Sequence, residues 1–206
     1  MEALEALYTR RSIKGFTDQM PSQDEIDKVT KAGTAAPTGM GMQSPYIVVV
    51  KNKALRDELS KMNAEVLGTH ADPFYNAPVI IVVLASKSRN TYMNDGSLVM
   101  GNMLNAAHAI GLGACWIHRA KEVFESERGK QLLKEWGIDD DCEGIGHIAL
   151  GYPAMEPKPA KPRKEGYVRV IEESAAPPYP PHVFRATTRR FHKKAWDHQA
   201  EPSCPA

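Results

Sequence analysis

Cysteine is scarce in this chain of 206 residues, and so are several other features that mark specialised classes of protein. The three cysteines are an odd number and form no C-x-x-C pair, which fits a reducing compartment better than a disulfide framework; they are Cys115, Cys142 and Cys204. The sequence shows no N-terminal apolar run of the kind found in secretory signal peptides. We therefore expect a cytoplasmic protein.

A strong charge of either sign is also missing. Lysine and arginine total 26 and aspartate and glutamate total 25, so the formal net charge is +1. This balance gives no reason to expect binding to nucleic acid or to a membrane surface, and no apolar segment is long enough to span a bilayer. With 42% hydrophobic and 25% charged residues, the composition is that of an ordinary soluble domain.

Common nucleotide-binding and catalytic motifs are absent as well. The chain has no G-x-G-x-x-G after a predicted strand, no G-x-x-x-x-G-K-[ST] and no G-x-S-x-G. The sequence therefore does not support a Rossmann dinucleotide site, a P-loop or a nucleophile elbow.

What the chain does contain is a long apolar stretch over residues 94–120. Its apolar residues are too frequent for one amphipathic stripe, which predicts a helix that is buried nearly all round. Asn94 or Asp95 is expected to cap the helix, and Gly111 and Gly113 are expected to end it. Such a helix needs more cover than one small sheet provides, so we expect a homodimer with this helix near the two-fold axis.

The other periodic segments predict a helix-rich domain with about five short strands. The expected strands cover residues 46–50, 78–84, 114–118, 145–150 and 167–171, and the expected helices cover 2–10, 22–36, 53–67 and 121–136. The strand Pro78–Leu84 is apolar throughout and needs cover on both faces, which predicts three layers. We place one domain over residues 1–171, followed by a proline-rich, basic extension over 172–206.

Two kinds of site can be drawn from the residues alone. A zinc site would use Cys115, His118, Cys142 and His147, although spacings this loose give many false matches. Alternatively, the basic stretch 10–14, the loop 37–43, the glycine turn at Gly113 and the segment 158–164 converge on one planar, anionic ligand. A Cys–His nucleophile pair lacks a third orienting group, and His108 is expected to be a hydrogen-bonded structural histidine.

The segments of the second alternative resemble the nitroreductase family of FMN-dependent oxidoreductases. They occur in the family's order across residues 1–171, while the extension after Glu172 is not covered. The matching residues are Arg10-Arg11-Ser12-Ile13-Lys14, Ala36-Pro37-Thr38-Gly39-Met40-Gly41-Met42-Gln43-Ser44-Pro45, Asp95-Gly96, Gly111-Leu112-Gly113-Ala114-Cys115-Trp116-Ile117, Gly151-Tyr152-Pro153 and Lys161-Pro162-Arg163-Lys164.

The resemblance implies an α+β three-layer sandwich with a mixed central sheet, assembled as a homodimer with FMN at the subunit interface. It assigns the phosphate and ribityl chain to Arg10, Ser12, Lys161 and Arg163, with Arg11 contributing through its backbone. It places Lys14 at the pyrimidine edge of the flavin and Gly113 and Ala114 near N5. The loop of the other subunit would border the ring through Pro37, Thr38, Gly39 and Gln43.

Two departures from the family pattern affect what is expected. Gly41 stands where asparagine is frequent, so one polar contact would be lost. The longer members carry a Pro-Glu-Gly turn near N5, whereas this chain has Gly-Leu-Gly-Ala-Cys-Trp, which places it with the shorter members.

The resemblance implies an enzyme that passes hydride from NAD(P)H through flavin N5 to nitroaromatics, quinones or similar electron-poor acceptors by a ping-pong mechanism. The cofactor supplies the chemistry, so no catalytic side chain and no metal is expected. The alternatives are a specialised flavin enzyme of the same fold, such as a reductive dehalogenase, and a non-enzymatic FMN-binding storage or sensor protein. The sequence leaves open the physiological oxidant, the choice of NADH or NADPH and the flavin's reduction potential.

Overall fold

The computed structural model describes residues 1–171. Its centre is a sheet of four strands in the order β1-β2-β4-β3, and all three neighbouring pairs are antiparallel. The strands are β1 (Pro45–Val50), β2 (Val79–Ser86), β3 (Gly113–Ile117) and β4 (Cys142–Gly151). Every residue of β2 is buried, as its unbroken apolar sequence predicts.

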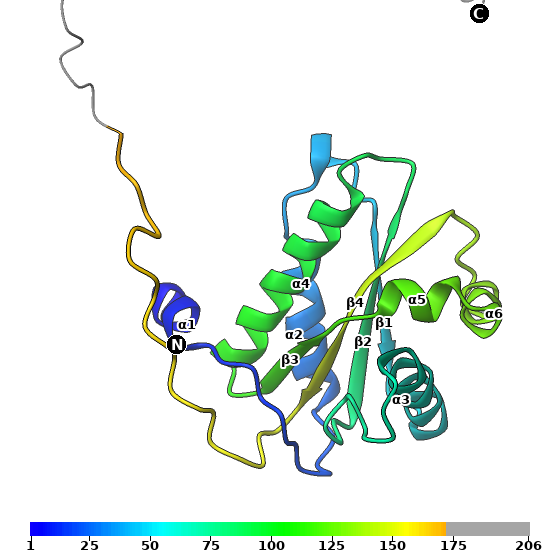
Figure 1. Ribbon diagram of the computed structural model, residues 1–206, viewed down its shortest axis with the longest axis horizontal. Helices are drawn as coiled ribbons and strands as arrows, with labels where there is room; N and C mark the ends of the chain where they lie inside the picture. Colours follow the sequence, from blue (N-terminus) through cyan, green and yellow to red (C-terminus); the bar gives the residue numbers. More distant parts are fainter. Residues whose placement is uncertain (172–206) are drawn as a thin grey trace, which may run out of the picture. The chain divides into compact units, whose positions relative to one another are not determined.

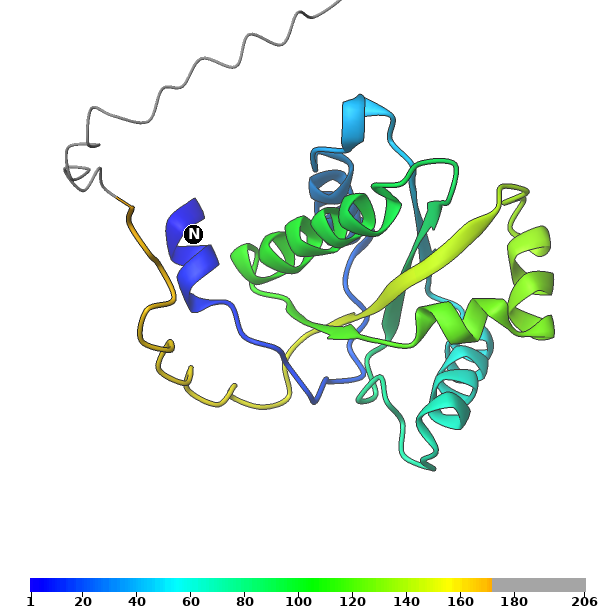
Figure 2. The same ribbon diagram turned by 45° about the horizontal axis from the view of Figure 1, so that its top comes forward.

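Helices cover both faces of this sheet (Figures 1 and 2). On one face lie α2 (Gln23–Thr34) and α4 (Tyr92–Ala109), and on the other lie α3 (Lys53–Leu67), α5 (Ala120–Glu125) and α6 (Glu127–Glu135). A short helix, α1 (Ala3–Thr9), contacts α4. The predicted three-layer arrangement is therefore present.

Alternate side chains of β2 supply the two cores. Ile80, Val82 and Leu84 belong to the core beneath α3, α5 and α6, whereas Val79, Ile81 and Val83 belong to the core beneath α2 and α4. This follows from the two-residue period of a strand, which sends successive side chains to opposite faces. At Ile145 the register of β4 against β2 shifts, because Val83 pairs with Gly146 and Leu84 pairs with Gly144.

The sheet differs from the prediction in two respects. It has four strands rather than five, because Tyr167–Ile171 forms no strand in the structure. Those β-branched residues have the composition of a strand, but a strand needs a neighbour to receive its backbone hydrogen bonds. The sheet is also antiparallel rather than mixed, since β4 lies between β2 and β3 and runs against both.

Two predicted helical features are corrected as well. The helix expected over 121–136 is two helices, because Ser126 takes an extended conformation and its hydroxyl caps α6 by accepting from the Gly129 amide. The central helix α4 begins at Tyr92, so neither Asn94 nor Asp95 is its cap. Gly111 follows α4 with a φ of 88°, as the prediction that glycine ends the helix requires.

The central helix is buried along one side only. Val99, Met100 and Met103 are buried against the sheet and α2, but Leu98 is 47% exposed. The expectation that α4 is covered all round is therefore wrong for a single chain.

Contacts divide the chain into two units, residues 1–161 and 162–206. Within the second unit, residues 162–171 form an exposed coil with a turn at Glu165–Gly166. None of the helices in residues 1–171 is both long and apolar enough to cross a membrane.

Candidate functional site

The basic segment 10–14 docks on the first residues of β3. Ser12 forms a parallel bridge with Ala114, and the Ile13 amide donates to the Ala114 carbonyl at 3.1 Å. Ile13 is buried as the anchor of this contact. A Cβ on Gly113 would lie 3.0 Å from the Ile13 side chain, so glycine allows the two backbones to approach. The structure thus brings together the basic segment and the glycine turn, as the second alternative of the sequence analysis expects.

A second set of backbone contacts fixes the end of this segment. Phe16 forms an antiparallel bridge with Pro153, and the Thr17 amide donates to the Tyr152 carbonyl at 3.0 Å. The Ala154 amide donates in turn to the Gly15 carbonyl at 3.0 Å. The predicted Gly151-Tyr152-Pro153 segment therefore pairs with the chain that directly follows the basic segment.

The cations gathered here lack a carboxylate partner in the part of the chain that the structure describes. Among residues 1–171, none of Arg10, Arg11 and Lys14 takes part in an ion pair. Burial, followed by repulsion from Arg11, lowers the pKa of Arg10. The Lys14 ammonium lies 5.7 Å from the centre of the Tyr75 ring, and Arg11 donates to the carbonyls of Tyr8 and Arg10. Positive charge held in this way favours an anionic ligand.

The last turn of α4 borders the same cations. The His108 Nε2 atom lies 2.8 Å from the Thr9 hydroxyl, so this histidine is hydrogen-bonded, as expected. Burial, then Arg10 and Arg11, lower the pKa of His108, and it is therefore neutral at neutral pH. Sequence analysis missed this contact, because nothing in the local pattern links residue 9 with residue 108.

The cysteine in β3 does not show the properties of a nucleophile. Cys115 is buried next to the Ser12 hydroxyl, and burial raises the pKa of its thiol. A thiol is reactive as its thiolate, which a raised pKa disfavours. Cys115 therefore packs beneath the basic segment as a small apolar side chain.

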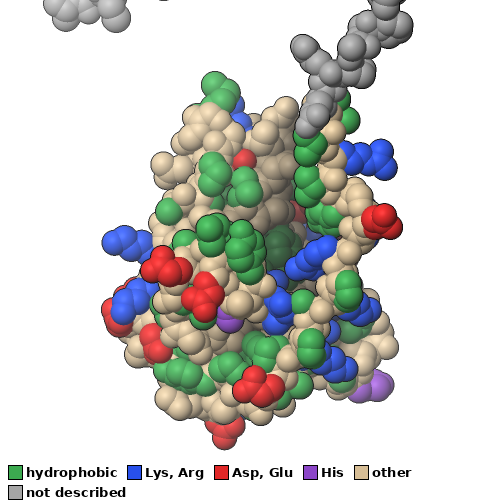
Figure 3. All heavy atoms as spheres, turned by 90° about the vertical axis from the view of Figure 1, so that its left-hand side faces the viewer, with side chains coloured by type: hydrophobic (Ala, Val, Ile, Leu, Met, Phe, Trp, Pro, Cys, Tyr) green, Lys and Arg blue, Asp and Glu red, His purple; other side chains and the backbone are tan. Residues whose placement is uncertain are grey.

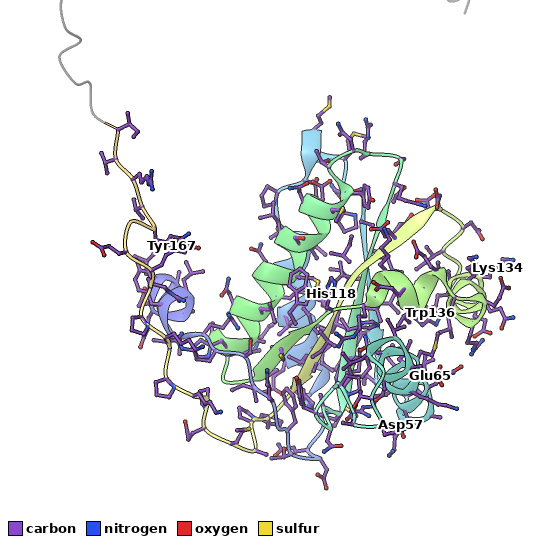
Figure 4. All side chains as sticks on the ribbon, viewed as in Figure 1. Asp57, Glu65, His118, Lys134, Trp136 and Tyr167 are labelled. Atoms are coloured by element: carbon purple, nitrogen blue, oxygen red, sulfur yellow. The ribbon has the colours of Figure 1, made fainter. Side chains whose placement is uncertain are left out.

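The residues of the zinc alternative are not gathered as ligands. Within residues 1–171, no three His, Cys, Asp or Glu side chains are placed to hold a metal ion. His118 is exposed just after β3 (Figure 4), and Cys142 lies at the start of β4. His147 is buried between the Phe74 and Phe124 rings, at centroid distances of 5.2 and 6.0 Å.

The loop 37–44 lies at the opposite end of α4 from the basic segment (Figure 1). Asp95, in the first turn of α4, contacts the loop, whereas His108, in the last turn, contacts the N-terminal segment. The two residues are thirteen positions apart along the helix, which corresponds to about 20 Å at 1.5 Å per residue. One chain therefore does not bring Pro37, Thr38, Gly39 and Gln43 to the basic segment.

The loop itself holds an unusual conformation. Gly39–Gly41 forms one 3₁₀ turn, in which Met40 has a φ of 54°. Gln43 has a φ of 51°, and its amide donates to the Thr38 hydroxyl at 3.0 Å. Positive φ is uncommon for residues other than glycine.

Asp95 contacts this loop, because its carboxylate accepts from the Gly39 amide. The sequence predicts a helix cap at Asp95, and this interpretation missed the contact with the loop.

The two remaining predicted contacts lie near the boundary between the units. Lys161 is exposed and is the last residue of the first unit. Arg163 belongs to the second unit, where it is also exposed. Their assignment to a phosphate stays a prediction.

A cavity of about 750 Å³ opens elsewhere, along α3 and the loop 68–72. Asp57 and Glu65 on α3 mark that side in Figure 4. The Arg56–Asp72 ion pair lies in its lining, and Asp72 also accepts from Ser60 and two backbone amides. These contacts order the loop 68–72 and pair the Arg56 guanidinium with a carboxylate. We therefore assign the cavity no functional role.

The fold and the site together define a three-layer α+β domain with an unpaired cationic segment at the edge of its sheet. The model of the Nitroreductase family matches residues 7–71 and 67–152, and the chain belongs to this family. The match covers the docked segment, the loop, the glycine turn and β4.

Individual relatives agree with this assignment. A protein of Archaeoglobus fulgidus, provisionally named an NADH dehydrogenase/NAD(P)H nitroreductase, is 32% identical over 161 residues, which cover 75% of this chain and 87% of that protein. The FMN reductase (NADPH) of Bacillus subtilis is 26% identical over 192 residues, which cover 80% of this chain and 72% of that protein.

Solved structures show the same fold. A nitroreductase with bound FMN from Bacteroides fragilis superposes with a TM-score of 0.76 at 22% identity, covering 84% of this chain and 100% of that chain. A nitroreductase in complex with FMN from Desulfovibrio desulfuricans gives a TM-score of 0.66 at 26% identity, and the superposition covers 84% of this chain and 98% of that chain.

Proposed function

We propose that this protein is an FMN-dependent oxidoreductase that uses NAD(P)H to reduce nitroaromatics, quinones or similar electron-poor compounds. The observation that carries the proposal is the docking of Arg10, Arg11 and Lys14 beside Gly113 and Ala114, where none of the three cations is paired with a carboxylate of residues 1–171. Bound FMN would supply the hydride chemistry at N5. The relatives named as NAD(P)H nitroreductase or FMN reductase support the same reading.

The residues of the site fit the charged end of such a cofactor. Arg10 and the Ser12 hydroxyl would hold the phosphate and ribityl chain, together with Lys161 and Arg163. Lys14 would place its positive charge at the pyrimidine edge of the ring. Gly113 and Ala114 would let the flavin approach the start of β3 closely.

A homodimer would complete the site. In one chain the loop 37–43 and the basic segment lie at opposite ends of α4, so the loop would serve the partner's cofactor. The same side of the molecule carries exposed apolar side chains on α1 and α4, which Figure 3 shows beside lysine and arginine side chains. These side chains are Leu4, Leu7, Tyr8, Met93, Leu98 and Ile110. An apolar surface of this kind favours a protein interface.

The cofactor assignment is tested by titrating FMN into variants of the basic segment. Arg10→Ala and Arg163→Ala should each weaken FMN binding by roughly tenfold to a hundredfold, since a charge-assisted hydrogen bond contributes about 1.5–3 kcal/mol. Arg128→Ala is the matched control, because Arg128 on α6 is already paired with Glu58 of α3 and Glu135 of α6. If both site variants bind FMN as tightly as the control does, Arg10 and Arg163 do not hold the phosphate.

Steady-state kinetics test the activity. One open face of the flavin would serve donor and acceptor in turn, so double-reciprocal plots with NAD(P)H and a quinone should be parallel. If neither nucleotide reduces the bound flavin faster than free FMN, the protein is a flavin carrier or sensor instead.

A further inference from the structure

The carboxylate of Asp95 holds both ends of the loop 39–44. Its Oδ1 atom accepts from the Gly39 amide at 2.9 Å, and its Oδ2 atom accepts from the Ser44 hydroxyl at 2.9 Å. The Thr91 hydroxyl donates to the same Oδ2 atom at 3.2 Å. One side chain on α4 thus closes the loop upon the first turn of the helix.

This carboxylate is buried and lacks a cation. Asp95 is 2% exposed, and it takes part in no ion pair among residues 1–171. Burying a carboxylate is costly unless donors replace its water. Here three donors do so, and the position in the first turn of α4 adds the favourable end of the helix dipole. The packing around it is equally close, because a Cβ on Gly39 would lie 2.4 Å from the Thr91 hydroxyl oxygen.

The loop held by Asp95 is strained and turned outward. Met40 and Gln43 both have positive φ, which is unfavourable for residues with a side chain. Met40 is 91% exposed, so the strain is not offset by burial of its side chain. Strain of this kind persists only where surrounding contacts enforce it, and it is typical of ligand-binding segments.

We propose that Asp95 is a positioning residue, which holds the loop 39–44 so that it presents Met40, Met42 and Gln43 to the flavin ring bound by the partner subunit. It touches neither cofactor nor substrate and acts only through Gly39, Ser44 and Thr91. The inference rests on the proposed function for the identity of the ligand, whereas the restraint of the loop stands on the hydrogen bonds alone.

Hydrogen exchange of the FMN-free protein tests the restraint. In Asp95→Ala the amides of Gly39 and Gln43 should exchange faster than in the wild type. Asp95→Asn should restore much of the protection, because an amide oxygen still accepts from Gly39 and the two hydroxyls can turn to accept. Ser126→Ala is the control for general destabilisation, since it removes the cap of α6 on the other face of the sheet. Unchanged protection of the loop in Asp95→Ala overturns the proposal.

Anaerobic reduction of FMN-loaded protein tests the link with the flavin. Asp95→Ala should retain FMN, because the loop does not hold the phosphate, but NAD(P)H should reduce its flavin roughly tenfold to a hundredfold more slowly. Asp95→Asn should lie near the wild type. A loop that opens while the reduction rate is unchanged overturns the proposal and leaves the proposed function intact. Wild-type protein that takes up no FMN overturns the proposed function, and the exchange result still decides whether Asp95 holds the loop.

Discussion

His147 shows how one buried side chain makes the fold sensitive to acid. It is fully buried between Phe74 and Phe124, and neither ring nitrogen has a hydrogen-bond partner among the described residues. Burial, aided by the positive charge of Arg119, lowers the pKa of His147 to about 3. The folded protein therefore keeps this histidine neutral, whereas the unfolded chain protonates it near its ordinary pKa of about 6.5.

The sign of the pH effect follows from this difference. The stability that neutral His147 allows is fully present above pH 6.5 and is lost as the pH falls toward 3, by about 1.4 kcal/mol per pH unit. We expect His147→Met, which is similar in size and does not titrate, to flatten the fall between pH 6.5 and 4.5. Urea denaturation of both proteins at several pH values measures how the free energy of unfolding changes with pH. Identical pH slopes in the two proteins would show that His147 is not the group responsible.

At the scale of elements, α4 packs closely against β4 where Gly96 of the helix faces Ile145 of the strand. A Cβ on Gly96 would lie 2.5 Å from Cγ1 of Ile145, at the register shift of β4. Ile145 is β-branched and has little freedom to turn away. We expect Gly96→Ala to destabilise the fold by about 1–3 kcal/mol, as overpacking does.

A double-mutant cycle separates this clash from a general effect on the helix. In an Ile145→Ala background the neighbouring side chain is gone, so Gly96→Ala should cost much less. Denaturant unfolding of the four proteins gives the coupling. Equal costs in both backgrounds would contradict a clash with Ile145.

Prediction from sequence succeeded for elements whose signal is local. The span of α3 and the buried strand β2 both follow from adjacent residues. Prediction failed where the deciding contact is distant. Tyr167–Ile171 reads as a strand but has no partner strand, and Asp95 reads as a cap although its bonds go to Gly39 and Ser44. The docking of the basic segment on Ala114 likewise has no local signal, and the residues alone indicated it only as one of two alternatives, which the resemblance then favoured.

At the scale of the whole molecule, the exposed side of α4 predicts the assembly. Leu98 on α4 is 47% exposed, and Leu67 at the end of α3 is 48% exposed. We expect Leu98→Asp to shift the protein from dimer to monomer, because a carboxylate would be buried in the proposed interface. Leu67→Asp, with the same chemistry and exposure on the other face, should leave the dimer intact.

Light scattering at micromolar concentration measures both variants. The FMN content of Leu98→Asp should fall with the dimer, since the cofactor is proposed to bind at the subunit interface and a monomer would lose the whole surface that the partner subunit contributes. A wild-type protein that is monomeric and FMN-loaded would refute the interface.

The docking of the basic segment also bears on the order in which parts of the domain fold. Its partners Ala114 and Tyr152 are separated from it by most of the domain's sequence, so their contacts close very long loops. Such contacts form late, because the entropy of closing a long loop is recovered only once the intervening elements have folded. The cations that would hold the phosphate therefore reach their places only after β3 and β4 exist. FMN would therefore bind only after the subunit has folded, and it would not serve as a template for folding.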